Sequence, residues 1–283
     1  MDEPQETRKL YGVPAGVSLA RALADAGAYV FTTADARRLA PRDVRSSQIP
    51  YLLKLMVDAG WLTRLRRDLY AGTGRLPGGT DVPAFAVATA LVSPSAVSHW
   101  SALAHHDLTD QVPVVVTATT PRKVVLPSMR SAGDSRETRH VWRAGGVDCQ
   151  YVTVRESRYF GFESVWIDDR FRVPITDRER TILDLFAMPR FFGGVAQGMA
   201  VLERSRGDLD LEKLLDYGVR YGAVAVTKRL GWALEHVGVS SRSLEQLRRV
   251  PAPHYSVFDP GRPRRGHHDR RWMIIENLAS SRP

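Results

Sequence analysis

The sequence contains only one cysteine, Cys149, among its 283 residues. A single cysteine excludes an intramolecular disulfide and a zinc site built from cysteines, and it favours a reducing, cytoplasmic location. No run of about eighteen apolar residues occurs, and the first residues are charged and polar, so the sequence predicts neither a membrane-spanning helix nor a signal peptide. Because Cys149 lies in a strand-like region, we expect it to be a small buried hydrophobic residue.

The sequence also lacks the motifs of common catalytic and nucleotide sites. It has no GxGxxG, no GxxxxGK[ST], no GxSxG and no HExxH. Two clusters, His105–Asp107 and His267–Asp269, resemble metal ligands, but adjacent histidines point apart and lack the i, i+4 spacing that brings two imidazoles to one metal. We expect the first cluster to pack in the fold and the second to lie in a solvated loop, so that no metal is bound.

Three carboxylates on one predicted helix are the remaining candidates for catalysis. Thr176 and Glu179 form a capping-box pattern, and Asp177 lies within it. Asp184 lies four residues after Arg180, which is the spacing of an intrahelical ion pair. Capping and pairing explain these residues without chemistry, and we therefore expect no catalytic residue, no cofactor and no enzymatic activity.

Composition and charge point instead to a soluble nucleic-acid-binding protein. Hydrophobic residues make up 43% of the chain and charged residues 25%, as in globular proteins, and the length suggests two domains. The formal net charge is +9. Between Arg37 and Arg67 there are eight positive residues and two negative ones, so this short stretch carries a net +6. A basic cluster of this kind is the electrostatic signature of a DNA-binding module, although most charge runs are ordinary solvated surface.

The stretch from Thr33 to Tyr70 has the order of a winged helix-turn-helix. Ser18 and Thr33 are the predicted caps of two helices, and Ser47 is the predicted cap of a third in which Pro50 falls at the third position. The third helix has an apolar stripe and an opposite polar face. The stripe comprises Ile49, Leu52, Leu53 and Met56, and the polar face comprises Gln48, Tyr51, Lys54 and Asp58.

Gly60 ends this helix, and the alternating residues 61–70 then predict a two-stranded ribbon with charged residues near its tip. We expect Ser46, Ser47, Gln48 and Tyr51 to face base edges and phosphates of duplex DNA. The residues expected to bind phosphates are Arg45, Lys54, Arg64, Arg66 and Arg67. Winged helices also serve as protein-interaction modules, so a scaffold with no DNA role stays an alternative.

Two prolines and two glycines within residues 76–83 predict a linker at 76–82 between residues 1–75 and a larger domain over 83–283. We expect helices over 84–91 and 97–106, a strand over 112–119 and several antiparallel strands over 139–174. Further helices are expected between Thr176 and Arg249, and two strands near the end flank a loop rich in arginine. The predicted fold class is therefore α+β, with an N-terminal winged helix-turn-helix and a larger mixed α/β domain. Eight arginines between 242 and 271 form a second basic cluster, which suits DNA, RNA, an acidic partner or plain solvated surface.

Four segments of the larger domain, taken in order, resemble the AbiEi-type antitoxin family of type IV, abortive-infection toxin-antitoxin systems. They are residues 98–103 with 108–113 (SHWSAL and LTDQVP), 175–185 (ITDRERTILDL), 228–235 (KRLGWALE), and 259–277, which runs from Asp259-Pro260 through Trp272 to Asn277. With the N-terminal segment the resemblance covers nearly the whole chain. Two positions depart from it, since Asp68 and Asp107 stand where glycine is expected.

The resemblance implies a cytoplasmic antitoxin that represses its own operon by binding operator DNA through its N-terminal domain. It also implies that the C-terminal domain counteracts a nucleotidyltransferase-type toxin, with or without direct contact, as part of phage defence. The alternative is a stand-alone winged-helix transcriptional regulator whose C-terminal domain senses a ligand.

Overall fold

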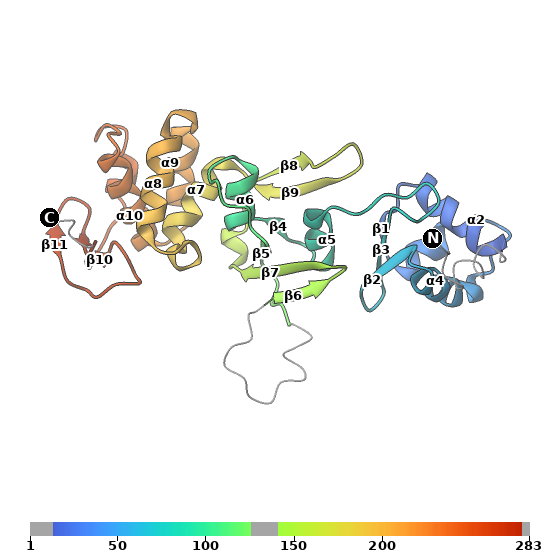
Figure 1. The fold of residues 1–283 in the computed structure, drawn as a ribbon. Helices are drawn as coiled ribbons and strands as arrows, with labels where there is room; N and C mark the ends of the chain where they lie inside the picture. Colours follow the sequence, from blue (N-terminus) through green and yellow to red (C-terminus); the bar gives the residue numbers. More distant parts are fainter. Residues whose placement is uncertain (1–13, 126–140, 279–283) are drawn as a thin grey trace. The chain divides into compact units, whose positions relative to one another are not determined.

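The computed structural model describes residues 14–125 and 141–278, and the chain mixes helices with antiparallel and parallel strands (Figure 1). This confirms the predicted α+β class. Among the described residues, no helix has both the length and the apolar character needed to cross a membrane.

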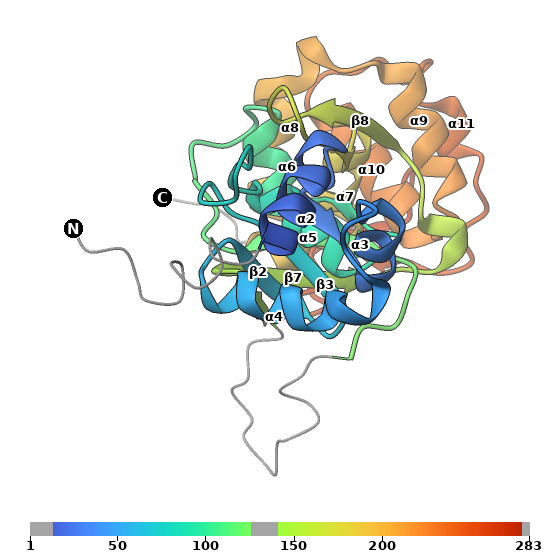
Figure 2. The same ribbon diagram turned by 90° about the vertical axis from the view of Figure 1, so that its right-hand side faces the viewer.

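Within its described residues, from 14 on, the N-terminal part of the chain has three α-helices and a small antiparallel sheet. Helices α2, α3 and α4 contact one another, α4 also contacts β2, and the strands follow the order β1-β3-β2 (Figure 2). The register pairs Phe31 with Tyr70 and Thr63 with Ala71. The elements are α2 (Pro14–Asp25), β1 (Val30–Phe31), α3 (Thr33–Leu39), a 3₁₀ turn (Ser46–Gln48), α4 (Ile49–Asp58), β2 (Leu62–Arg66) and β3 (Leu69–Gly72).

The apolar stripe predicted for α4 is buried as expected. Ile49, Leu52, Leu53 and Met56 are each at most 2% exposed and pack in one core with residues of α2, β1 and β2. Burying such side chains stabilises the fold by roughly 1.5–3 kcal/mol each. The helix is therefore held by its inner face, and its polar face is left to solvent.

The starts of the first two helices differ from the sequence prediction. Helix α2 begins at Pro14, so Ser18 lies inside it rather than at its cap. Thr32, and not Thr33, caps α3, because its hydroxyl accepts from the Asp35 N–H while the Asp35 carboxylate accepts from the Thr32 N–H.

The start of α4 also differs. A 3₁₀ turn over Ser46–Gln48 precedes it, so Gln48 is the N-cap, Ser47 does not cap, and Pro50 is the second helical residue. The early proline is tolerated because its missing N–H has no partner in a first turn.

A six-stranded sheet follows, in the order β6-β7-β5-β4-β9-β8. Val97 in β4 pairs antiparallel with Ala118 of β5 and parallel with Ile175 of β9. Residues 96 and 97 thus form a strand where a helix was predicted from 97, because partners far along the chain determine a strand this short. The elements are α5 (Ala84–Leu91), β4 (Ala96–Val97), α6 (His99–His105), β5 (Val116–Thr120), β6 (Val141–Ala144), β7 (Val147–Thr153), β8 (Phe162–Trp166) and β9 (Arg172–Thr176).

The rest of the chain is mainly helical and ends in a three-stranded sheet of order β10-β12-β11, in which β10 and β12 are parallel. Strand β11 lies within the arginine-rich loop and was not predicted. The elements are α7 (Arg178–Ala187), α8 (Val195–Ser205), α9 (Leu211–Arg220), α10 (Val224–His236), α11 (Glu245–Arg248), β10 (Ser256–Val257), β11 (His267–Asp269) and β12 (Ile274–Glu276).

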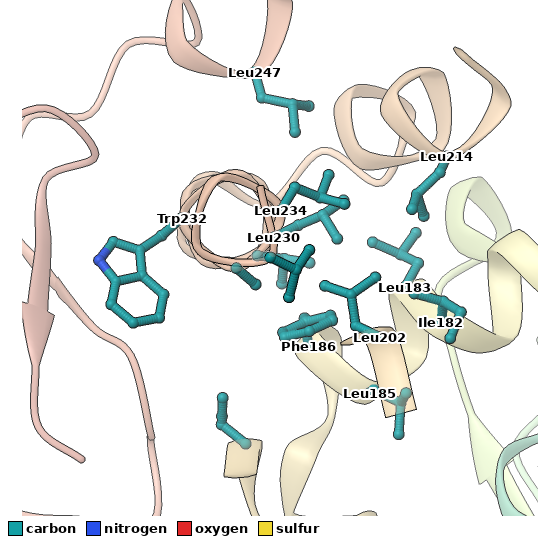
Figure 3. Close-up of a cluster of buried hydrophobic side chains, with 14 of the residues drawn as sticks. Ile182, Leu183, Leu185, Phe186, Leu202, Leu214, Leu230, Trp232, Leu234 and Leu247 are labelled. Carbon is teal, nitrogen blue, oxygen red and sulfur yellow. The ribbon is translucent and has the colours of Figure 1, made fainter. Parts of the chain in front are cut away.

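Helix α10 is central to the core of this helical part. Figure 3 shows Leu230 and Leu234 on one side of α10, directed toward Phe186 and its neighbours on α7, with Trp232 on the opposite side. Leu230 is fully buried and Leu234 is 1% exposed. The helix is therefore covered on both faces.

Charged side chains are also buried in this core. Arg180 and Asp184 form the predicted ion pair, with Nε and Oδ1 3.0 Å apart and neither side chain exposed. A buried charge is retained only when it is paired and hydrogen-bonded, and Arg180 Nη1 also donates to the carbonyls of Arg158 and Phe160. Asp177 rather than Thr176 caps α7, since its carboxylate accepts from the Arg180 N–H.

Two tryptophans interlock α10 with the last strands. Trp272 Nε1 donates to Glu235 over 2.6 Å, and Trp232 Nε1 donates to Glu276 over 3.0 Å. The Trp272 ring lies directly on Gly231, where any side chain would overlap it. Glycine is therefore required for this close approach.

The described chain divides into two compact units. The first takes in the described residues of Met1–Ser95, Val124–Tyr151 and Ser164–Val173, and the second those of Ala96–Lys123, Val152–Glu163 and Pro174–Pro283. The sequence predicted a linker at 76–82 between domains over 1–75 and 83–283. Those boundaries describe parts that would fold independently, and they stay predictions.

Candidate nucleic-acid interface

The polar face of α4 is open to solvent. Tyr51 is 61% exposed, and Gln48, Lys54 and Asp58 are exposed as well. They lie at spacings of three and four residues, so they share one side of the helix, opposite the buried stripe. An α-helix that presents hydrogen-bonding side chains along one free face has the dimensions to enter the major groove of DNA.

The turn before α4 places three more predicted residues at the surface. Arg45, Ser46 and Ser47 are all exposed. The Gln48 amide oxygen accepts from the Arg45 N–H over 3.2 Å, which fixes the turn. Gln48 therefore uses its acceptor locally, and its NH₂ group remains as a donor toward acceptors such as base edges or phosphates.

The β2–β3 hairpin carries the other predicted cations. Arg64, Arg66 and Arg67 are exposed, and the register of the two strands shifts between Arg64 and Arg66. Within the described residues, no carboxylate lies at ion-pair distance from these three arginines or from Arg45 and Lys54. Their charge is thus available to neutralise phosphates.

Asp68 at the hairpin turn makes a contact that the sequence did not reveal. Its backbone is left-handed, with φ 59°, and its carboxylate accepts from the Thr33 N–H over 3.1 Å. Hydrogen bonds from Thr33 lower the pKa of Asp68 despite its partial desolvation. This bond ties the hairpin turn to the start of α3, a contact 35 residues apart that no local pattern signals.

The two histidine clusters take different environments. His106 is buried, and its Nε2 lies 2.7 Å from the Thr176 carbonyl oxygen, whereas His105 is exposed. His267 and His268 are exposed in β11, which is a strand rather than the expected loop. The described part of the chain contains no group of three or more His, Cys, Asp or Glu side chains arranged to hold a metal.

Two surface hollows among the described residues are candidate places for a small ligand. One, of about 360 Å³, is lined by His106, Asp107, Arg178, Arg204 and Asp208 among others. The other, of about 570 Å³, lies between α9 and the residues around Arg242. Both are open and lined by charged side chains, whereas small-molecule sites are mostly enclosed and apolar.

Comparison with known proteins establishes the fold alone. No family model matches this chain. No curated protein sequence matches it either. A crystal structure of the RV2827C protein from Mycobacterium tuberculosis is similar, with a TM-score of 0.63 at 14% identity over 94% of this chain and 92% of that chain.

Proposed function

We propose that this protein is a DNA-binding antitoxin that represses its own operon. In this proposal residues 1–75 form a winged helix-turn-helix, with α4 as the recognition helix and the β2–β3 hairpin as the wing. Residues 83–283 counteract a nucleotidyltransferase-type toxin in the cytoplasm, as the resemblance to AbiEi-type antitoxins implies.

The DNA-binding half of this proposal rests on one observation, which is that α4 and the β2–β3 hairpin lie in the same compact unit. The helix is buried on its apolar side and exposed along Gln48, Tyr51 and Lys54. The hairpin beside it in sequence presents arginines without carboxylate partners among the described residues. Base contacts from a helix and phosphate contacts from a basic ribbon together are what a winged helix uses on duplex DNA.

Two backbone conformations support the family resemblance. Asp68 and Asp107 occupy the positions where that resemblance leads us to expect glycine. Both are left-handed, with φ 59° and 57°. Aspartate is among the few residues other than glycine that adopt this conformation readily, so the substitutions keep the turns that glycine would make.

A mobility-shift titration tests the DNA-binding half. The protein is titrated against its own upstream region and a length-matched random duplex, at two salt concentrations. A sequence-specific repressor prefers the upstream region and loses affinity steeply with salt. Equal affinity for both duplexes would contradict autorepression, and no binding at low salt would contradict DNA binding altogether.

The antitoxin half has a separate test. If a nucleotidyltransferase gene lies beside this one, its expression alone should arrest growth and co-expression of this protein should restore it. Rescue by residues 83–283 alone would assign neutralisation to the C-terminal region. Growth arrest that persists with the full chain would instead favour a stand-alone regulator.

A further inference from the structure

A second basic surface lies far along the chain from the first, in the loop of residues 259–271, here called the arginine loop. Residues 261–268 are all exposed, and so are residues 270 and 271. The loop carries five arginines against two aspartates. The arginines are Arg262, Arg264, Arg265, Arg270 and Arg271.

The backbone of the arginine loop is fixed by one buried side chain. Asn277 is 5% exposed, and its Nδ2 donates to the carbonyls of Asp259, Arg262 and Pro263 over 2.8, 3.4 and 3.1 Å. Its Oδ1 accepts from the Asp259 N–H over 2.7 Å. A loop held this way loses little further entropy when a ligand binds, so its surface is preorganised.

Further contacts fix the other end of the loop. Gly266 packs so closely on the Glu276 carbonyl that a side chain would overlap it, and His267 pairs with Glu276 in the β11–β12 ladder. Asp269 accepts from the N–H groups of Arg271 and Trp272. Hydrogen bonds, strand pairing and close packing therefore fix the conformation of the loop.

The loop arginines differ in their partners. Arg262 lies 3.5 Å from Asp259, Arg271 lies 2.8 Å from Glu235, and Arg264 donates to the Tyr255 carbonyl. The side chains of Arg265 and Arg270 make no hydrogen bond or ion pair with any described residue. A fixed backbone thus holds two guanidinium groups at the surface, and no described residue accepts a hydrogen bond from either of them.

From this arrangement we propose that the arginine loop is a second nucleic-acid site, which binds phosphodiester backbones without regard to base sequence through Arg265 and Arg270. Guanidinium groups pair with phosphate oxygens through two parallel hydrogen bonds. A protein partner fits less well, because protein interfaces combine arginine with large apolar or aromatic anchors, and the loop exposes none of the latter.

Fluorescence anisotropy of the full-length protein tests this site. The probes are a mixed-sequence DNA duplex unrelated to the promoter and one of its single strands, titrated across a range of salt. The variant is Arg265→Ala with Arg270→Ala, made in the wild type and in the Arg66→Ala, Arg67→Ala background. The matched control replaces two other exposed arginines of the same unit, Arg122 and Arg155, with alanine.

On the duplex, loss of both arginines should lower the log-log salt slope by about 1.8, at 0.9 per phosphate contact, in both backgrounds. On the single strand the decrease should be about 1.4, at 0.7 per contact. Lysine at both positions should restore much of the slope, because the charge is kept.

An unchanged slope on both probes would overturn the proposal, and an acidic protein surface would then be the class of partner to seek. An equal decrease in the control variant would also overturn it, since total charge and not this loop would then set the affinity. The probes contain no promoter sequence, so the salt slopes measured here do not depend on whether the protein prefers its own promoter. A failed promoter-preference test would contradict autorepression and leave the test of the arginine loop valid.

Discussion

Asp68 combines a left-handed backbone with a hydrogen bond to the start of α3, and the two effects can be separated by substitution. Asp68→Ala loses the acceptor and keeps the strained conformation, whereas Asp68→Gly loses the acceptor without strain. We expect the alanine variant to be less stable than the glycine variant by about 1 kcal/mol. This is the low end of the free energy that a residue with a Cβ atom loses in a left-handed backbone conformation. Urea unfolding of both variants measures the difference.

Asp68→Asn is the matched control, because asparagine tolerates the same backbone and can accept the same hydrogen bond. It should be the most stable of the three variants. Equal stability of the alanine and glycine variants would mean that this turn does not hold a left-handed residue in solution.

Asp35 provides a pH-dependent contribution to stability. Hydrogen bonds from the Thr32 backbone and hydroxyl, with the Arg38 side chain, lower the pKa of Asp35 from 3.8 to about 2. A depressed folded-state pKa stabilises the fold at pH values above the unfolded pKa, and the contribution is lost as pH falls from about 4 toward 2. The gap in unfolding free energy between wild type and Asp35→Asn should therefore be largest above pH 4 and shrink on acidification.

Unfolding free energies of the two proteins across this pH range provide the measurement. Asp58→Asn is a suitable control, because Asp58 is exposed near the C-terminal end of α4. A gap that stays constant down to the lowest pH would show that the capping box does not depress the Asp35 pKa.

At the scale of elements, the hairpin arginines allow a test of the proposed wing. Arg66→Ala with Arg67→Ala should weaken binding to promoter and random duplex alike, because phosphate contacts carry no sequence information. The log-log salt slope should flatten by about 0.9 for each lost contact. The alanine pair at Arg122 and Arg155 again controls for total charge, and a slope that matches wild type would remove the hairpin from the interface.

The sequence predicted elements well wherever local pattern determines them. The helix over 84–91 was predicted at its observed bounds, and the buried stripe of α4 follows directly from apolar spacing. Starts of helices were less predictable, because several polar residues in a row can each act as a cap. Thr32 beside Thr33 and Asp177 beside Thr176 are two such choices, decided by side-chain geometry and not by residue type.

For the candidate interface, the sequence could identify cations but not their surroundings. Positions 66 and 229 are both arginine, yet their surroundings differ. Arg66 is exposed, whereas Arg229 is buried and donates to the Phe186 carbonyl. Burial lowers the pKa of Arg229 to about 10. Contacts between residues far apart in sequence decide whether an arginine is buried or exposed. The hydrogen bonds of Asp68 and Asn277 could not be predicted from the sequence for the same reason.

At the scale of the whole molecule, the lone cysteine is a reporter of folding. Cys149 in β7 is fully buried, and burial raises the pKa of its thiol to about 11. Because the thiolate is the reactive form, a thiol reagent at pH 8 should label the native protein far more slowly than the urea-unfolded protein. Labelling followed against urea concentration should match the unfolding transition seen by circular dichroism. Fast labelling without urea would show that β7 opens locally.

The contact between Trp272 and Gly231 also has a consequence for synthesis on the ribosome. Helix α10 emerges well before the tryptophan that covers its glycine face, and β10 cannot pair until its parallel partner β12 has followed. Until then this face of a central core helix has no cover. The nascent chain therefore passes through a stage in which a chaperone that binds exposed apolar helices has an opportunity to act, and this opportunity closes when Trp272 docks.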